Sequence, residues 1–451
     1  MPNPFDTIAA LATPVGTAAL AVVRISGQDT QRLVAGLAGR PPPPRHPVYL
    51  DYRDRAGGLV DDVLLTYFAG PRSYTGEDAA EISCHGNPFI AQKILEDLFA
   101  RGCRPAEPGE FTQRAFLHGK MDLTQAEAVM DLIHARSDCA LAAAQDQLRG
   151  ALGRRMGELV DALLSVLARV EAYIDFPDED LPSEDRSWIQ SELQKITNET
   201  GRLLATSHYG QILRDGIKTV IVGQPNAGKS SLLNRLVGRP RALVSSEPGT
   251  TRDFIEERIV LGPHCLRLID TAGLNPSPSG LEKLGIENTR EQLSAADLVL
   301  LVVDRSEAGT LLLMPDEVPL ERTILVLNKS DITLTSHLPG AWRMSKIPTV
   351  NLSALTGVGL DQLRGDITRL ADKFQQKVGS DHIAVNARHA HAMREARAGL
   401  ESALAKVVDH GPTELLASDL RSVLGALGEI TGKVDNEQML DHLFATFCIG
   451  K

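Results

Sequence analysis

The chain has 451 residues, of which 43% are hydrophobic and 23% charged, and its formal net charge is −11. That length predicts about three domains, and the negative charge excludes general attraction to phosphates as the basis of any nucleic-acid binding. No apolar run approaches the roughly 18 residues that span a bilayer, no signal or transit peptide is apparent, and the 5 cysteines are scattered without CxxC pairs, so we expect a cytoplasmic protein without disulfides.

Residues 1–118 are predicted to form a mixed α+β domain. Residues 19–26 and 61–68 are rich in β-branched residues or alternate in polarity, which is typical of strands. The apolar spacing of residues 88–102 predicts a helix that ends at its final glycine. Residues 39–46 contain a run of prolines, which have no N–H for a strand ladder, so this segment is predicted to be a surface loop.

The pattern becomes helical at about Leu123. Residues 123–148 and 156–174 carry apolar side chains at spacings of three and four, with few glycines or prolines, which predicts long amphipathic helices. Acids and prolines in residues 175–187 predict a solvated loop between helices. We therefore assign residues 119–213 to the first part of a helical domain.

Residues 214–375 alternate apolar strands with helical segments, which predicts a parallel sheet covered on both faces. The helical pattern returns afterwards, so residues 376–451 are the second part of the helical domain, and the α/β domain is inserted between the two parts. The predicted strands of the inserted domain are residues 218–223, 266–271, 297–304, 323–329 and 347–354.

A phosphate-binding loop is predicted at residues 223–230, whose sequence is GQPNAGKS. It lies between a predicted strand and a predicted helix, which is the context that this Walker A pattern requires. Its glycines let the backbone close around phosphates, and N–H groups at the helix amino terminus would point toward them. Lys229 would supply positive charge for the β- and γ-phosphates, and Ser230 a hydroxyl for Mg²⁺.

Two further segments complete the phosphate and magnesium chemistry. DTAG, residues 270–273, ends a predicted strand, where Asp270 can hold Mg²⁺ through water and the Gly273 amide can reach a γ-phosphate. In GTTRD, residues 249–253, Thr251 can complete the Mg²⁺ shell.

Two segments favour guanine over adenine. In NKSD, residues 328–331, the Asp331 carboxylate can accept hydrogen bonds from guanine N1–H and its amino group, a pair of donors that adenine lacks. SAL, residues 353–355, is placed to lie behind the base. GQPNAGKS, DTAG, NKSD and SAL, in this order, indicate a guanine-nucleotide switch domain.

The predicted switch lacks two usual catalytic groups. Leu274 stands where signalling GTPases carry a glutamine that orients water, and no arginine is marked by sequence as a charge-neutralising finger. Asn226, inside the phosphate loop, either shapes that loop or offers its amide oxygen to a monovalent cation, and its position does not decide between the two. Glu282, taken alone, fits a solvated helix face.

Several blocks together resemble the MnmE (TrmE) family of tRNA modification GTPases. They are GQPNAGKSSLLN, GTTRD, DTAGL…EKLGIE, NKSD, SYTGEDAAEISCHGNP, PGEFTQRAFLHGKMDLTQAEAVMDLI and the terminal FCIGK. The resemblance spans nearly the whole chain. It implies a folate-binding, GcvT-like α+β domain at residues 1–118 that pairs two chains into a homodimer. It also implies a discontinuous helical domain with an inserted Ras-like P-loop G domain.

The resemblance implies a GTPase in which K⁺ takes the place of an arginine finger. Asn226, Ser245, Glu247 and Thr250 would then hold K⁺, Ser230 and Thr251 would hold Mg²⁺, and Glu282 would position water. The residues assigned to GTP by motif and resemblance are Asn226, Ala227, Gly228, Lys229, Ser230, Ser231, Ser245, Ser246, Glu247, Pro248, Gly249, Thr250, Thr251, Asp270, Thr271, Ala272, Gly273, Asn328, Lys329, Asp331, Ser353 and Ala354.

The resemblance also implies a reaction. With an FAD-containing partner of the MnmG (GidA) type, in a heterotetramer, such a protein adds a carboxymethylaminomethyl or aminomethyl group to carbon 5 of the wobble uridine of certain tRNAs. A tetrahydrofolate of the 5-formyl type supplies the carbon, and FAD belongs to the partner. Arg24, Glu81, Lys120 and Lys451 match the folate contacts. Cys448 would lie near this chemistry, where it either acts covalently or shapes the site.

Two alternatives come from the residues themselves. The G motifs alone also fit a ribosome-assembly or regulatory GTPase that acts as a binding switch without modification chemistry. Such proteins usually append a basic RNA-binding domain, whereas this chain is acidic. The terminal CIGK has the spacing of a prenylation box, but Gly450 and Lys451 fit that box poorly, so we expect no membrane anchor.

Overall fold

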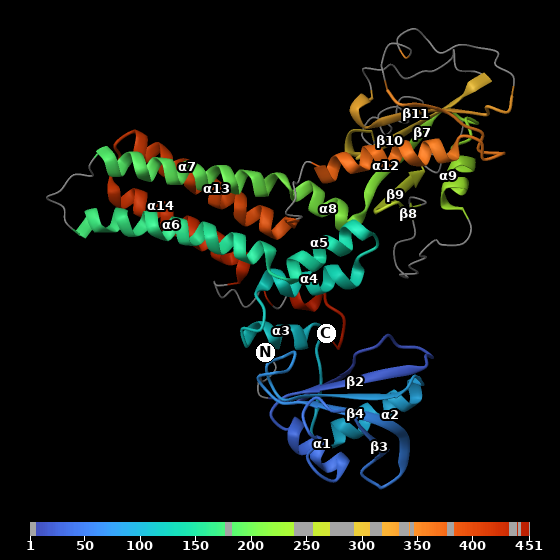
Figure 1. The fold of residues 1–451 in the computed structure, drawn as a ribbon, viewed down its shortest axis with the longest axis vertical. Helices are drawn as coiled ribbons and strands as arrows, with labels where there is room; N and C mark the ends of the chain where they lie inside the picture. The colour runs from blue at the N-terminus through green and yellow to red at the C-terminus, as the bar shows by residue number, and fades with distance from the viewer. Residues whose placement is uncertain are drawn as a thin grey trace, which may run out of the picture. The chain divides into compact units, whose positions relative to one another are not determined.

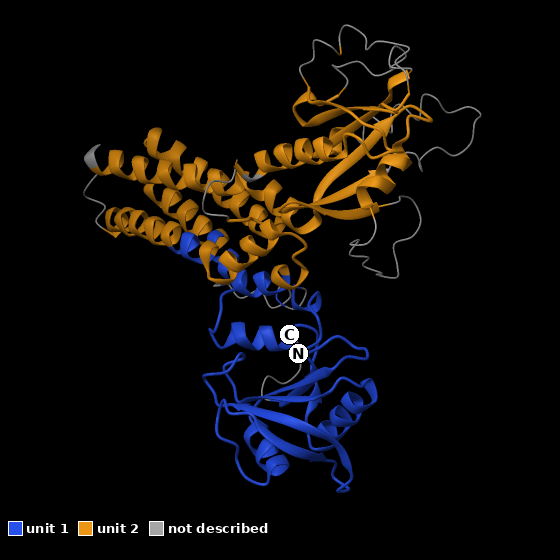
Figure 2. Cartoon of the chain, turned by 45° about the vertical axis from the view of Figure 1, so that its right-hand side comes forward, with its two compact units in different colours: residues 1–130, 153–157, 427–451 blue, residues 131–152, 158–426 orange. Residues whose placement is uncertain are grey.

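The chain divides into two compact units. Unit 1 comprises residues 1–130, 153–157 and 427–451, and unit 2 comprises residues 131–152 and 158–426 (Figure 2). The part of the chain that the computed structural model describes is residues 6–175, 183–238, 256–270, 293–306, 318–332, 342, 347–376, 383–432, 440 and 443–450.

Unit 1 is built on a six-stranded sheet with the order β3-β4-β5-β2-β1-β6. The strands pair antiparallel except for β1 and β6, which are parallel. Helices α1 and α2 pack against the sheet through Leu33, Val34, Ile94 and Leu98 (Figure 1). The elements are β1 (Ile8–Leu11), β2 (Leu20–Ser26), α1 (Thr30–Ala38), β3 (Val48–Arg53), β4 (Leu59–Phe68), β5 (Ala79–His85), α2 (Pro88–Ala100) and β6 (Arg104–Pro105).

The predicted strands at 19–26 and 61–68 are confirmed as β2 and β4, and the predicted helix at 88–102 as α2. Helix α2 begins where the sequence provides a cap: Asn87 accepts a hydrogen bond from the Phe89 N–H at 2.9 Å, and Pro88 takes the first helical position. The polyproline segment is irregular, as predicted.

The carboxyl-terminal residues of unit 1 return to its amino-terminal part. Helices α3 (Glu110–Leu117) and α4 (Leu123–His134) follow the sheet in sequence. Phe444 and Phe447 are buried in one apolar cluster with Leu123 and Ala126 of α4. This cluster joins residues that lie more than 300 positions apart in the chain.

The helices that follow α3 differ in two places from the sequence prediction. Residues 123–148 form α4 and α5 rather than one long helix, because the Ser137 side chain accepts a hydrogen bond from the Ala140 N–H and caps a new helix. Helix α7 begins at Ser183, inside the loop predicted for 175–187. The helices are α5 (Asp138–Leu148), α6 (Ala151–Asp175), α7 (Ser183–Ala205), α8 (Ser207–Asp215), α13 (Ala387–Val408) and α14 (Thr413–Thr431).

Helices α7 and α13 lie side by side, although the second sheet falls between them in sequence (Figure 1). That sheet has six strands in the order β12-β11-β10-β7-β9-β8, all parallel except the edge strand β8, which is antiparallel to β9. Its elements are β7 (Ile217–Gly223), α9 (Lys229–Val237), β8 (Glu256–Leu261), β9 (His264–Asp270), β10 (Leu298–Asp304), β11 (Thr323–Asn328), β12 (Thr349–Asn351) and α12 (Leu360–Gln376).

Both faces of the second sheet are covered, as the continuous apolar strands predicted. Ile221 of β7 belongs to a cluster with residues of α9 and α12, while its neighbours Val220 and Val222 belong to a second cluster with Leu293 and Trp342. All five predicted strands are present. Across both units, no helix in the described part of the chain combines the length and apolar character of a membrane span.

Candidate functional site

The predicted phosphate loop lies between β7 and α9. Gly228 has φ of 93°, and a Cβ there would lie 2.2 Å from Nδ2 of Asn328, so this position requires glycine. The Lys229 ammonium is folded over the loop and donates to the carbonyls of Gly223 and Gln224 at 3.0 and 2.9 Å. These two hydrogen bonds close the loop at the amino terminus of α9. Ser230, in the first turn of that helix, is exposed.

Asn226 stands at the tip of this loop. Its backbone has φ of 63°, in the left-handed region that asparagine tolerates better than most residues. The residue is exposed, and its amide makes no hydrogen bond to any other described residue. The amide oxygen is therefore available to a ligand.

Asn328 ties the phosphate loop to the segment predicted to lie behind the base. It is 2% exposed, its Nδ2 donates to the Ala227 carbonyl at 2.8 Å, and its Oδ1 accepts from the Ala354 N–H at 2.9 Å. The side-chain N–H and the side-chain oxygen of this buried amide thus each have a hydrogen-bond partner. The structure thus brings together three residues that the sequence assigned to GTP binding from three different motifs: Asn328, Ala227 and Ala354.

Lys329 pairs with a residue that the sequence reasoning missed. Its ammonium lies 2.6 Å from Oδ2 of Asp304, whose Oδ1 accepts from the N–H and hydroxyl of Ser306. Burial raises the pKa of Asp304, but the bonds from Lys329 and Ser306 outweigh burial and hold it below its ordinary value. Asp304 ends β10 opposite Asn328 on β11. Because the carboxyl ends of parallel strands share one edge of a sheet, the sequence could have indicated Asp304 as a site residue.

Asp331 and Ser353 follow the carboxyl ends of the neighbouring parallel strands β11 and β12. Asp331 is exposed just beyond β11, where its carboxylate can receive a base, while Ser353 is fully buried and its hydroxyl accepts from the Thr356 N–H at 3.2 Å. Asp270 ends β9, and only its backbone is described. Outside the described residues lie Ser245, Ser246, Glu247, Pro248, Gly249, Thr250, Thr251, Thr271, Ala272, Gly273, Glu282 and Lys451.

In unit 1, two of the predicted folate contacts form one ion pair. Arg24 on β2 lies opposite Glu81 on β5, and Nη2 of Arg24 is 2.9 Å from Oε1 of Glu81. The guanidinium also lies 5.5 and 5.7 Å from the ring centroids of Tyr74 and Phe111. Its Nη1 donates to the Gly450 carbonyl at 3.2 Å. The carboxyl-terminal tail therefore reaches this pair.

The tail that carries Cys448 is held by its backbone. The Cys448 carbonyl accepts from the Gly109 N–H at 3.3 Å, and the cysteine itself is exposed. A Cβ on Gly450, which has φ of 90°, would lie 2.4 Å from the Leu11 carbonyl oxygen. The backbone at Gly450 thus packs so closely against Leu11 that there is no space for a side chain.

Lys120 contacts the connection between β4 and β5. Its ammonium donates to the Pro71 carbonyl at 2.9 Å, and its stem lies against Gly76. A cavity of about 580 Å³ adjoins it. Its lining residues are Gly27, Gln28, Gly76, Glu77, Asp78, Arg114, Leu117 and His118.

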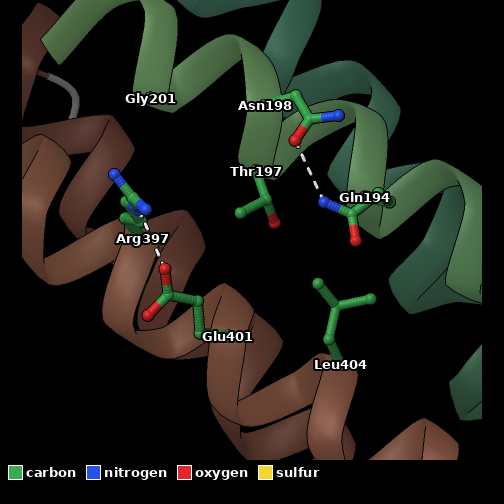
Figure 3. Close-up of a pocket in the computed structure, with 7 residues that line it drawn as sticks. All are labelled: Gln194, Thr197, Asn198, Gly201, Arg397, Glu401 and Leu404. Atoms are coloured by element: carbon green, nitrogen blue, oxygen red, sulfur yellow. Dashed lines mark hydrogen bonds and ion pairs between the residues drawn. The ribbon is translucent and has the colours of Figure 1, made fainter. Parts of the chain in front are cut away.

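A second hollow, of about 400 Å³, lies in unit 2 between α7 and α13 (Figure 3). Arg397 is paired there with Glu401 at 2.8 Å, and Gln194 donates to Asn198 at 3.0 Å. Since its charged side chains satisfy one another, this hollow does not by itself indicate a ligand. No sequence motif pointed to it.

Two family models match the chain. The model described as the GTP-binding protein TrmE N-terminus matches residues 7–120, and the model described as the MnmE helical domain matches residues 123–448. The chain belongs to the MnmE family. The MnmE helical-domain match covers the helices on both sides of the second sheet as well as the sheet itself.

Curated MnmE relatives match over the full length. The tRNA modification GTPase MnmE of Opitutus terrae is 60% identical over 100% of both chains, and that of Akkermansia muciniphila is 44% identical over 100% of both. Among solved structures, the G domain of the FeoB iron transporter of T. maritima covers 34% of this chain and 98% of its own, at 29% identity and a TM-score of 0.25. The assignment to MnmE rests on the family models and the curated relatives.

Proposed function

We propose that this chain is a K⁺-dependent GTP hydrolase that works in the modification of the wobble uridine of certain tRNAs. The observation that carries the proposal is the full-length similarity, at 60% identity, to a protein named as a tRNA modification GTPase. The phosphate loop and the Asn328 bridge support it, since they prearrange a nucleotide site from three separate segments.

In the proposed hydrolysis each side chain has a distinct task. Lys229 neutralises the β- and γ-phosphates, and Ser230 with Thr251 holds Mg²⁺. Asp331 accepts the two N–H donors of guanine, which excludes adenine. Glu282 orients the attacking water in place of the glutamine that Leu274 replaces.

Potassium would supply the positive charge that no arginine provides. Asn226 supports this part, because its exposed amide lies in the phosphate loop without a partner among the described residues. Ser245, Glu247 and Thr250 would complete the cation's oxygen shell.

The modification chemistry would use a tetrahydrofolate bound in unit 1. The ion pair suits such a ligand: Oε1 of Glu81 is taken by Arg24, whereas Oε2 receives no hydrogen bond from the described residues and can accept pterin N–H groups. Lys120 and Lys451 would meet the carboxylates of the glutamate tail. Arg24, which is paired with Glu81, would lie at the pterin end. Cys448 would lie beside the transferred carbon.

The proposal extends to architecture and partners. A GcvT-like domain at residues 1–118 would form the homodimer, and a G domain at 214–375 would be inserted between helical parts at 119–213 and 376–451. An FAD-containing partner of the MnmG type would join it in a heterotetramer in the cytoplasm. The full-length match to MnmE relatives supports these parts together.

Two measurements test the proposal. GTP turnover of the full chain in K⁺ and Na⁺ buffers should be several-fold faster in K⁺, and Glu282→Ala should bind GTP but hydrolyse it slowly. Nucleoside analysis of tRNA from cells lacking the chain should show unmodified wobble uridines. Normal wobble uridines would instead favour a binding switch without modification chemistry, and equal rates in the two cations would remove the role of K⁺.

A further inference from the structure

We infer that Arg235 is a positioning residue for guanine recognition. It acts by holding the segment that lies behind the base, residues 353–355. The inference rests on the proposed binding of GTP and adds a residue that no motif marks. Arg235 is exposed on α9, one turn and a half beyond Lys229.

Arg235 holds two successive carbonyl groups of the base segment. Its Nε donates to the Ala354 carbonyl at 3.0 Å, and its Nη2 donates to the Leu355 carbonyl. Two parallel N–H groups on one planar guanidinium fix the orientation of both peptides, which a lysine ammonium cannot do. The next residues are also fixed, because Ser353 accepts from the Gly357 N–H at 2.8 Å through its carbonyl.

The hydrogen bond to the Ala354 carbonyl also fixes the direction of the Leu355 N–H, which belongs to the same peptide group. In a trans peptide the carbonyl and the following N–H point in opposite directions. The Leu355 N–H therefore points away from Arg235, and no described residue accepts it. Asn328 holds the other end of the segment through the Ala354 N–H. An unused donor, aimed from a segment fixed at both ends, suits the keto oxygen of guanine.

A simpler role for Arg235 is to stabilise the carboxyl end of α9, where a cation interacts favourably with the helix dipole. That role would affect the whole phosphate-loop helix. The positioning role affects only ligands that carry the base. The two roles therefore differ in their effect on pyrophosphate, which occupies the phosphate loop alone.

The test compares Arg235→Ala and Arg235→Lys in the full-length protein. We expect Arg235→Ala to weaken GDP binding about tenfold to a hundredfold, as for the loss of hydrogen bonds from a charged donor. Its affinity for inorganic pyrophosphate and its kcat at saturating GTP should stay within about twofold of wild type. Arg235→Lys, which keeps the charge but loses the paired N–H groups, should also weaken GDP binding.

A matched control and a base analogue sharpen the result. Arg322→Ala removes another arginine that donates to a backbone carbonyl, that of Ser294, away from the site, and GDP binding should not change. The diphosphate of 2-aminopurine riboside lacks the keto oxygen and also the N1–H that Asp331 would accept. Wild type and Arg235→Ala should therefore both bind it weakly, and with equal affinity.

Three outcomes overturn the inference: wild-type GDP affinity in Arg235→Ala, an equal loss of pyrophosphate binding, or an undiminished effect with the 2-aminopurine nucleotide. If Arg235→Ala does not fold, Arg235→Lys gives the same comparison. A wild-type protein that binds ADP as tightly as GDP would refute the proposed GTP function itself, which is a different result.

Discussion

Nη1 of Arg24 donates to the carbonyl of Gly450 at 3.2 Å, which joins the second strand of the chain to its penultimate residue. The same guanidinium forms an ion pair with Glu81 through Nε and Nη2. Arg24 therefore connects the proposed folate site to the segment that carries Cys448. Any change in Arg24 should affect both.

We expect Arg24→Lys to abolish most wobble-uridine modification while GTP turnover stays within about twofold of wild type. Lysine keeps the charge but cannot hold Glu81 and the Gly450 carbonyl together. Nucleoside analysis after complementation and a phosphate-release assay measure the two activities. Arg53→Lys, at an exposed ion pair with Asp51 on β3, is the matched control and should modify tRNA normally. A parallel loss of GTP turnover in Arg24→Lys would contradict the prediction.

Gly450→Ala should release the tail without unfolding unit 1. A left-handed backbone costs a residue with Cβ about 1–2 kcal/mol, and this Cβ would in addition meet the Leu11 carbonyl. Residues 448–451 should become sensitive to carboxypeptidase, and modification should fall. Gly425→Ala, in α14 with nothing near its Cβ, should instead stabilise the protein by up to about 1 kcal/mol. A protected tail in Gly450→Ala would show that the backbone adjusts.

Variants of Asn226 can separate cation binding from loop shape. Asn226→Gly keeps the left-handed backbone at no steric cost but removes the amide oxygen, so we expect normal GTP binding and no stimulation by K⁺. Asn226→Asp keeps an oxygen and should retain some stimulation. The measurement is GTP turnover over a series of K⁺ concentrations at constant ionic strength. Full K⁺ stimulation in Asn226→Gly would mean that the residue only shapes the loop.

Glu110→Gln should destabilise unit 1 at pH 7 by about 3 kcal/mol, because it breaks a buried charge network. Oε1 of Glu110 lies 2.6 Å from Nη2 of Arg104 and 2.9 Å from Nη2 of Arg114. Burial raises its pKa, but the hydrogen bonds from Arg104, the Glu107 N–H and Arg114 outweigh burial and lower the pKa below the ordinary 4.5.

The sign of that shift gives a pH dependence. A carboxyl with a lowered folded-state pKa adds stability above its unfolded pKa, and the stability is lost as the pH falls through the folded value. Urea unfolding should therefore show the full difference between wild type and Glu110→Gln at pH 7, and a difference that shrinks steadily as the pH falls below about 4. A difference that does not change with pH would mean that the charge of Glu110 contributes little.

Local patterns predicted most of the fold. The apolar strands of the second sheet and helix α2 were readable because burial on both faces, or a cap such as Asn87, leaves a mark within a few residues. The break between α4 and α5 was missed, since a single serine decides it against a continuous apolar pattern. The edge strand β8 was missed because its exposed face carries Glu256 and other polar residues.

The candidate site was predictable where its chemistry is local. The phosphate loop needs Gly228 and Lys229 at fixed spacing, so the sequence alone indicated it. Contacts between distant segments left no such mark: Arg235 touches residues 119 and 120 positions away. Asp304 could have been found by noting that β10 and β11 end at one edge, but Arg235 carries no comparable signal.

The return of the carboxyl-terminal residues has a consequence for synthesis of the protein. Phe444 and Phe447 pack with Leu123, and Arg24 bonds to Gly450, so unit 1 is completed only after residues 444–450 have been translated. While the ribosome makes the intervening three hundred residues or so, the surface of α4 that receives Phe444 has no partner from the tail. Chains released early would expose that surface to proteases, so the cell could remove incomplete copies before they bind tRNA or a partner.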